Sequence, residues 1–368
     1  MFLDAQNSEN RIFLSITSKN LLLKDTMNPT RSSEIAFSYK SDVAKTKYKR
    51  YKFSPEITSQ IKELTKLNNW HGLLALLQDY FIILATILIT SHITWFFYPI
   101  ALLVIGSRQR ALTTILHESA HGVLAKNKLL NSVLGTFCSG YLILQQMTVY
   151  KKSHCYEHHC HLGSPELDPD FKFYRAEGLY NPHSPKHFLV KHIIQPLLLF
   201  KVPKYLFYLA KHRLFEKGGN SRESTMMQVY LLTIVGASIW FGFWEELILF
   251  WLIPYLTVFQ VLGYFIEVSE HYPLVGKNRI DLYMSRNRFS LWYEAFFTSM
   301  HGENFHLVHY LMPSVPFWKQ DKAHNILLTD ANYARHNSLT GGIFFSANGA
   351  FSIMSSWIEY IYPSTIEA

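Results

Sequence analysis

The chain has 368 residues, of which 49% are hydrophobic, 15% aromatic and only 17% charged. An ordinary soluble domain is about 25% charged, so this composition argues against a soluble globular protein and favours one in contact with lipid. The formal net charge of +8 does not indicate a nucleic-acid partner, because the Lys and Arg residues flank apolar segments, as they do on the cytoplasmic face of a membrane.

The distribution of polar residues predicts three regions. Residues 1–55 are polar and rich in Lys and Ser, and they lack the basic start, apolar run and cleavage site of a signal peptide. They predict an N-terminal tail that ends in a basic stretch near the membrane surface. Residues 56–335 hold the long apolar segments and are expected to form one membrane domain, followed by a C-terminal segment over residues 336–368.

Four apolar segments predict transmembrane helices, since crossing a bilayer takes about 20 apolar residues. The first two, Gly72–Thr90 and Ile93–Ser107, follow each other closely. The second pair, Met226–Phe243 and Leu247–Val268, is joined by a short acidic connection. These segments predict an all-α membrane protein with four transmembrane helices in two hairpins.

Two further apolar segments are expected to lie at the membrane surface. Leu129–Met147 is long enough to span, but a span would place the histidine motifs before and after it on opposite sides, so we expect a re-entrant or interfacial segment. Lys186–Phe215 has apolar residues every three or four positions among Lys and His. It predicts an interfacial amphipathic helix, broken near Pro196 and Pro203.

The first histidine motif is HESAH, which places His117 and His121 four residues apart. On a helix this spacing puts both imidazoles on one face, within reach of one metal ion. The same pattern occurs in zinc proteases, where the glutamate, here Glu118, acts as the general base. The motif alone therefore leaves an intramembrane zinc protease open.

The second motif, HCYEHHCH, carries His154, His158, His159 and His161. His161 is an extra histidine that could support a ligand or lie at the surface. His154 lies one turn before His158 and is expected on the same helix face. Adjacent residues on a helix point about 100° apart, so His158 and His159 can face different metal ions.

The third motif, HGENFHLVHY, carries His306 and His309 at a spacing of three, with His301 five residues upstream. His271 follows Glu267 by four residues at the end of the last apolar segment. The three motifs and His271 offer more imidazoles than the three or four that one zinc ion takes, so they predict two metal ions. Imidazole suits zinc, copper, iron and nickel.

Taken in order, HExxH, HxxxHH and HxxH followed by Leu-Met-Pro-Ser-Val-Pro resemble the histidine boxes of the membrane fatty acid desaturase and hydroxylase superfamily. The resemblance covers roughly residues 72–317. It implies four transmembrane helices with interfacial helices and a cytoplasmic helical cap that holds the boxes. It also implies two iron ions, dioxygen as the oxidant and a lipid acyl chain as the substrate, most simply in a desaturase acting on an acyl lipid or acyl thioester.

The resemblance also assigns roles to individual residues. The catalytic histidines of the three boxes would be His117, His121, His154, His158, His159, His306 and His309, and the iron ligands would be these seven with His271 and His301. Carboxylates that would orient the imidazoles are Glu118, Glu157, Asp168, Asp170 and Glu270. Phe, Trp and Leu residues on the lipid side would line a channel for the alkyl chain.

One position departs from the family pattern. Tyr310 follows His309, where the family usually has a second adjacent histidine. A tyrosine is a weaker iron ligand unless it is deprotonated. Either the site works with one ligand fewer, or His301 or His271 compensates, or the iron site is altered.

The sequence leaves the reaction type and the electron source open. Hydroxylation or ketolation of a lipid or terpenoid chain is an alternative to desaturation, because the boxes do not separate these outcomes. The zinc protease would leave the second and third boxes unexplained. No Gly-x-Gly-x-x-Gly opens a helix for a nicotinamide or flavin, and no His-Pro-Gly-Gly of a fused haem domain is present. A separate ferredoxin- or haem-type electron donor is therefore implied.

Overall fold

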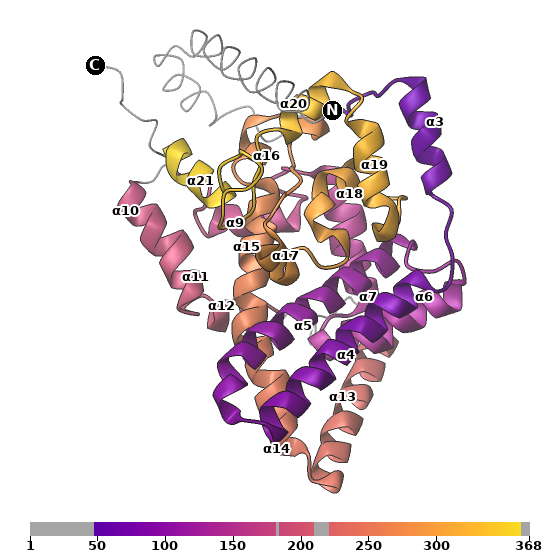
Figure 1. The fold of residues 1–368 in the computed structure, drawn as a ribbon, viewed down its shortest axis with the longest axis vertical. Coiled ribbons are helices and arrows are strands. Elements are labelled where there is room, and N and C mark those ends of the chain that lie inside the picture. Colours follow the sequence, from indigo (N-terminus) through magenta and orange to yellow (C-terminus); the bar gives the residue numbers. More distant parts are fainter. Residues whose placement is uncertain (1–47, 182–183, 210–220, 362–368) are drawn as a thin grey trace, which may run out of the picture. The chain divides into compact units, whose positions relative to one another are not determined.

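The computed structural model describes residues 48–181, 184–209 and 221–361. Within these ranges the chain is helical, and its extended pairings are two isolated β-bridges. The α-helices are, in chain order, α3 Pro55–Leu64, α4 His71–His92, α5 Tyr98–His121, α6 Lys128–Gly135, α7 Met147–Lys151, α8 His159–His161, α9 Pro169–Ala176, α10 Pro185–Phe188, α11 Gln195–Leu197, α12 Val202–Leu209, α13 Ser221–Phe241, α14 Trp244–Leu247, α15 Gln260–His271, α16 Leu274–Lys277, α17 Trp292–Thr298, α18 His306–Leu311, α19 Gln320–Leu327, α20 Ala331–Asn337 and α21 Ile353–Ile361. Figure 1 shows the long helices α4, α5 and α13 toward one end and the shorter helices α16 and α18 to α20 toward the other.

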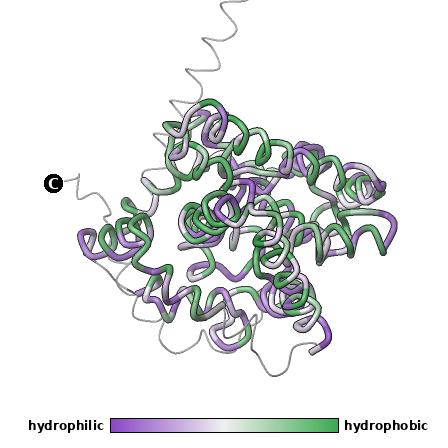
Figure 2. The backbone as a smooth tube through the Cα atoms, turned by 90° about the horizontal axis from the view of Figure 1, so that it is seen from below, coloured by the Kyte–Doolittle hydropathy of each residue, from purple (hydrophilic) through white to green (hydrophobic). Residues whose placement is uncertain are grey.

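Three helical segments are long and apolar enough to cross a membrane: His71–His92, Ser221–Phe241 and the 34-residue run Trp244–Lys277. They correspond to the first, third and fourth predicted spans. Figure 2 views the chain from the end where α4 and α13 lie, and it shows hydrophobic residues along the long helices. Between the last two segments the chain reverses at Gly242, whose φ of 77° lies in the left-handed region that glycine tolerates.

Helix α5 departs from the prediction. The expected span Ile93–Ser107 covers only its first half, and the helix continues to His121. It is absent from the candidate spans among the described residues, because its second half carries Arg108, Gln109 and Arg110, all of them buried. Three of the four predicted spans thus correspond to helices of spanning length, and the arrangement in two hairpins stays a prediction. Helix α5 carries polar side chains into the protein interior.

The apolar side chains of α5 fix its orientation. Leu112, Ile115 and Leu116 are fully buried and pack against Leu76 of α4 and Phe259. Their burial turns the opposite face of α5 toward a cavity that contains the histidine motifs. The sequence of α5 therefore separates a packing face from a functional face.

The two segments expected at the membrane surface are interrupted helices. Leu129–Met147 begins in α6, continues through a π-helical turn at Thr136–Gly140 and a 3₁₀ turn, and ends at Leu144 with a left-handed φ of 58°. None of these pieces is long enough to span. Lys186–Phe215 is likewise broken, between α11 and α12, where Leu199 has a φ of 63°; residues 210–215 lie outside the described part.

The last residues of the predicted tail contact the helical domain. The Lys49 amide donates to the Arg279 carbonyl (2.7 Å), and the Asp281 amide donates to the Lys49 carbonyl (3.1 Å). The Tyr51 amide donates to the Asp281 carboxylate at 2.7 Å. Residues 48–54 are therefore packed on the helical domain, and the remainder of the predicted tail, residues 1–47, lies outside the described residues.

A buried charge cluster joins the long helices to the third histidine motif. Asp79 of α4 is fully buried; its carboxylate lies 3.5 Å from the Arg108 guanidinium and 2.6 Å from Nε2 of His301. His301 and Gly302 both have left-handed backbones, with φ of 49° and 73°. The cluster therefore holds a tight turn of the third motif against α4 and α5.

Replacing Asp79 by alanine should lower the free energy of unfolding by about 3–5 kcal/mol, because removing one partner leaves a buried guanidinium without its carboxylate. Thermal unfolding of the protein in lipid nanodiscs measures this effect. Asp321→Ala, an exposed aspartate in the first turn of α19, is the matched control and should leave stability unchanged. Equal stability of the two variants would contradict the structural role of Asp79.

Candidate metal centre

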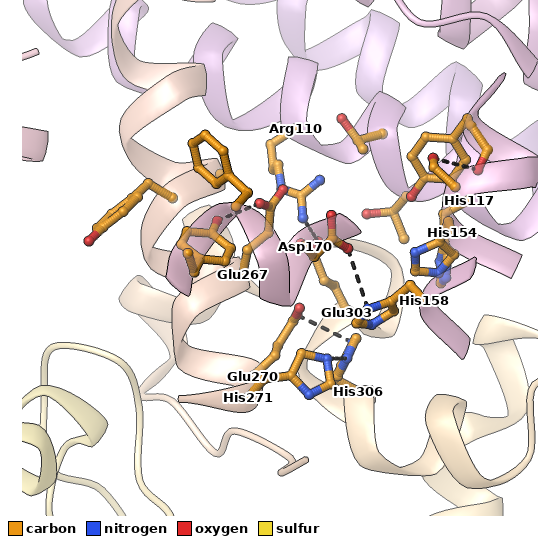
Figure 3. Close-up of a pocket in the computed structure, with 18 of the residues that line it drawn as sticks. Arg110, His117, His154, His158, Asp170, Glu267, Glu270, His271, Glu303 and His306 are labelled. Atoms are coloured by element: carbon orange, nitrogen blue, oxygen red, sulfur yellow. Dashed lines mark hydrogen bonds and ion pairs between the residues drawn. The ribbon is translucent and has the colours of Figure 1, made fainter. Parts of the chain in front are cut away.

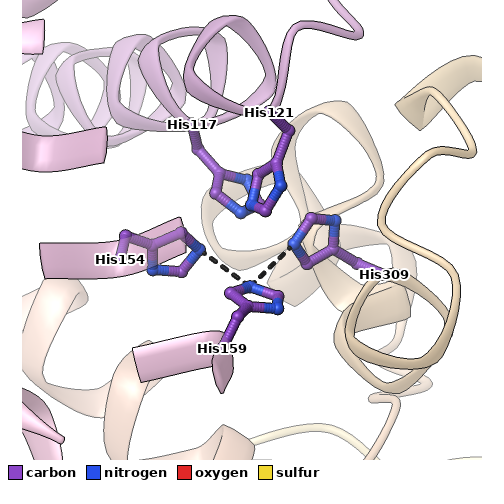
Figure 4. Close-up of side chains that lie close together, drawn as sticks. All are labelled: His117, His121, His154, His159 and His309. Atoms are coloured by element: carbon purple, nitrogen blue, oxygen red, sulfur yellow. Dashed lines mark hydrogen bonds between the residues drawn. The ribbon is translucent and has the colours of Figure 1, made fainter. Parts of the chain in front are cut away.

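Five imidazoles form the larger of two histidine groups. Nε2 of His159 lies 3.1 Å from Nε2 of His154 and 3.3 Å from Nε2 of His309. Such separations match two nitrogens held by one metal ion at about 2.0–2.1 Å each. The group consists of His117, His121, His154, His159 and His309 (Figure 4). Each offers one ring nitrogen, and these five nitrogens all lie within 4.8 Å of one another.

A π-helical turn decides which histidines of the second motif belong together. Residues Lys152–His158 are π-helical, and the His159 amide donates to the His154 carbonyl, five residues back. This i to i+5 pattern puts His154 and His159 on one face. The ring of His154 also stacks on that of His158, with centroids 5.5 Å apart, but its ligand nitrogen groups with that of His159 and not with that of His158. The predicted separation of His158 from His159 is found.

The smaller group consists of His158, His271 and His306. Nε2 of His306 lies 3.0 Å from Nε2 of His271, and the rings of His158 and His271 are 5.1 Å apart between centroids. Figure 3 shows these three side chains around the lower part of the cavity. His306 and His309 fall in different groups although they lie one turn apart on α18.

The outward ring nitrogen of each histidine in the smaller group faces an acceptor. Nδ1 of His158 lies 3.0 Å from Asp168, and Nδ1 of His271 lies 3.0 Å from the Met284 carbonyl. Nδ1 of His306 lies 3.5 Å from Glu270. Acceptors at Nδ1 orient an imidazole so that its Nε2 faces the metal.

Asp168 combines this role with a helix cap. Its side chain is fully buried and accepts the Asp170 and Phe171 amides at the start of α9, as well as the Gly163 amide. Burial opposes a charge on Asp168, but His158 and these amides outweigh it and lower the pKa of the carboxyl group. Burial also opposes a charge on His158, yet Asp168 raises the pKa of His158 to about 9.

The donor set fits metal ions. Nε2 of His117 and of His121 is buried and has no hydrogen-bond partner among the described residues, an expensive state for a polar atom. Burial, reinforced by neighbouring histidines, lowers the pKa of four histidines outside the apolar spans well below the usual value, so they stay in the neutral form that binds metals; these are His154, His159, His306 and His309.

Not all predicted residues meet at the centre. His301 lies against Asp79 instead of joining either histidine group. Among the predicted carboxylates, Glu118 lies 3.8 Å from His117 and Asp170 lies 3.5 Å from His158, whereas Glu157 pairs with Lys152 at 3.7 Å. His301 and Glu157 are thus the two predicted residues that the structure places apart.

Tyr310 supports a histidine instead of replacing one. Its ring stacks on His159, with centroids 5.0 Å apart and an interplanar angle of 15°. Its hydroxyl donates to the His159 carbonyl at 3.2 Å, and the Tyr48 hydroxyl donates to the same oxygen at 2.7 Å. Burial raises the pKa of Tyr310, so the phenol remains protonated and is a poor metal ligand.

A cavity of about 210 Å³ adjoins both histidine groups. Arg110 and Glu303 line this cavity and form an ion pair at 2.6 Å; neither is among the predicted site residues. Arg110 precedes His117 by seven residues, and the periodicity of polar residues within α5 is the signal that could have identified it.

A comparison with known protein families shows to which family the chain belongs. The fatty acid desaturase family model matches residues 93–339, which is more than half of the chain. The chain belongs to the fatty acid desaturase family. This confirms the predicted superfamily and, with three apolar helices of spanning length, identifies a membrane protein.

Two relatives carry desaturase names. Dihydrorhizobitoxine desaturase of Bradyrhizobium elkanii is 38% identical over 306 residues, which cover 81% of this chain and 87% of that protein. The sn-1 acyl-lipid omega-3 desaturase (ferredoxin) of Synechocystis sp. is 29% identical over 177 residues, which cover 45% of this chain and 47% of that protein. A desaturase-type oxidoreductase is therefore the enzyme class that the relatives support.

Asp168→Asn should weaken metal binding about 10–100-fold, the usual effect of losing the hydrogen-bond partner of a metal-binding histidine. The amide keeps an oxygen that can cap α9, so the fold is retained. Metal content measured during titration with a chelator reports the change, and circular dichroism checks the fold. Unchanged metal retention would show that Asp168 only caps the helix.

His301→Ala should keep the full metal content, because its imidazole contacts Asp79 and neither histidine group. His306→Ala should lose metal from the smaller group. Elemental analysis of both purified variants, expressed per folded chain, gives the comparison. Equal metal loss in the two variants would restore His301 to the ligand set.

Proposed function

We propose that the protein is an oxygen-dependent di-iron desaturase that converts a CH₂–CH₂ unit of its substrate into CH=CH. The observation that carries the proposal is the pair of adjoining imidazole groups with five and three members. His158 and His159 are sequence neighbours in different groups, and so the two groups adjoin. Their eight imidazoles are the ligands proposed for two irons.

The proposed reaction balances with an external reductant. One dioxygen, two hydrogen atoms from adjacent substrate carbons, and two electrons with two protons from outside give the alkene and two waters. Bound iron would supply the oxidising power that acid–base side chains lack. The protein's own part is to hold the imidazoles in position, and Asp168, Glu270 and the Met284 carbonyl orient the rings of the smaller group.

The two electrons are proposed to come from a separate ferredoxin- or haem-type protein. The name of the Synechocystis relative includes ferredoxin, which supports this class of donor. We place the metal centre on the cytoplasmic side of the membrane, because Lys and Arg are enriched beside the apolar segments and such residues favour that side.

Desaturation is preferred to its rivals. Both relatives are named as desaturases, which favours this outcome over hydroxylation or ketolation. The zinc protease is disfavoured because His117 and His121 belong to a group of five, whereas a zinc site takes three or four protein ligands. Glu118, the base in that alternative, accepts the Phe317 amide at 2.9 Å.

The sequence-based prediction of a lipid acyl substrate rests on the family. The names of the two relatives do not agree on the substrate, since one is an acyl-lipid desaturase and the other acts on dihydrorhizobitoxine.

Purified protein should contain about two irons per chain, because the chain offers two imidazole groups and a metal site takes three or more protein ligands. With dioxygen and a one-electron donor, cells that express it should accumulate a product two mass units lighter than its substrate, the mass of two hydrogen atoms lost as a double bond forms. Mass spectrometry and elemental analysis measure both.

His159→Ala should abolish product and reduce iron, whereas His187→Ala, an exposed histidine of α10, should change neither. One zinc without iron, or a product heavier by one oxygen atom, would contradict the desaturase proposal.

A further inference from the structure

The cavity beside the histidine groups has a polar wall formed by α5. Arg110, Thr113, Thr114 and His117 follow the i, i+3, i+4, i+7 pattern and line it together. The hydroxyls of Thr113 and Thr114 and the amide oxygen of Gln145 are buried without a hydrogen-bond partner among the described residues. These three residues are at most 8% exposed. An alkyl chain would leave these groups unsatisfied, and a polar occupant would pair them.

The inner part of the cavity carries an excess of negative charge. Glu303 pairs with Arg110 at 2.6 Å, and Glu270 lies 3.7 Å from Arg288. Glu267 has no cation within ion-pair distance in the described part of the chain; its carboxylate accepts a tyrosine hydroxyl at 2.7 Å. The second oxygen of Glu303 is buried and has no hydrogen-bond partner. Figure 3 shows the carboxylates of Glu267 and Glu303 beside Arg110.

The outer part carries an excess of positive charge. Lys201 and Lys204 share one carboxylate, Glu177, and Nζ of Lys201 is buried without a hydrogen-bond partner. Lys201 lies 5.5 Å from the ring of Tyr264, which precedes Glu267 by less than one turn of α15. The Lys204 side chain is 73% exposed, so this end of the cavity reaches solvent.

From this arrangement we infer that the substrate is a small polar molecule with both an ammonium and a carboxylate group, and not a free alkyl chain. Its ammonium group lies against Glu267 and the free oxygen of Glu303, and its carboxylate lies against Lys201. Its remaining carbons extend toward the histidine groups. The inference rests on the proposed function, because it takes the occupant of the cavity to be the substrate.

The test compares three soluble probes of matched carbon skeleton. Norleucine carries both charges, hexanoate lacks the ammonium group and pentylamine lacks the carboxylate. Isothermal titration calorimetry on the iron-loaded protein in phosphatidylcholine nanodiscs gives their Kd values. Norleucine should bind about tenfold more tightly than either partial probe, because each charge gains a charge-assisted contact.

Single variants assign each charge to its side chain. Glu267→Gln should remove the preference for norleucine over hexanoate, and Lys201→Met should remove the preference over pentylamine. Glu63→Gln, whose side chain is 68% exposed on α3, is the matched control and should keep both preferences. Glu267→Gln leaves the Arg110 ion pair intact, so loss of folding does not confuse the result.

Two further arms separate the sources of the ligand. If phosphatidylserine in the nanodiscs competes with norleucine, a lipid headgroup supplies the same two charges. If stearate binds, unaffected by Glu267→Gln and Lys201→Met, while norleucine does not, the inference is overturned. Iron content is measured on the same preparation, which separates two outcomes. Protein that contains two irons but binds stearate contradicts this inference and not the di-iron proposal. Protein that lacks two irons contradicts the di-iron proposal, and the Kd values of the three probes can still be compared.

Discussion

The structure depends on one constraint: several imidazole nitrogens converge to about 3 Å from each other inside the protein. Nε2 of His271 and His306 are 3.0 Å apart, and Nε2 of His154 and His159 are 3.1 Å apart. Nε2 of His117 and of His121 is buried beside them without a hydrogen-bond partner among the described residues, which is costly, and a bound metal ion would remove that cost. The turns, caps and charge pairs around them hold the rings in this arrangement.

Much of the metal centre could be predicted from spacing within single motifs. His117 and His121 share a helix face because four residues nearly complete a turn, and the structure has their rings 4.8 Å apart. The grouping of His154 with His159 could not be predicted, because a π-helical turn changes the periodicity and nothing in the local sequence requires one. Motif spacing therefore identifies candidate ligands more reliably than it assigns them to individual sites.

The positions of the other predicted residues depend on contacts between segments that are distant in sequence. His301 was expected among the ligands, but Asp79, 222 residues earlier, holds its imidazole. Tyr310 seemed to mark a missing ligand, yet its ring stacks on His159. The fold shows the same limit. Three of the four predicted spans correspond to helices of spanning length. Helix α5 differs because its buried Arg108 and Arg110 pair with Asp79 and Glu303 on other segments.

The lining of the cavity differs from what the acyl chain, the usual substrate of the family, would require. The proposed di-iron centre would oxidise whichever C–H bond lies beside it, so the residues that line the cavity would decide the substrate. Here α5 and α15 place Arg110 and Glu267 on that lining, where an acyl channel would need apolar side chains.

X-ray absorption at the iron edge tests most directly the central claim, that imidazoles hold two irons. A first shell dominated by nitrogen, with imidazole multiple scattering at both irons, is predicted; a shell dominated by sulfur or by carboxylate oxygen would contradict it.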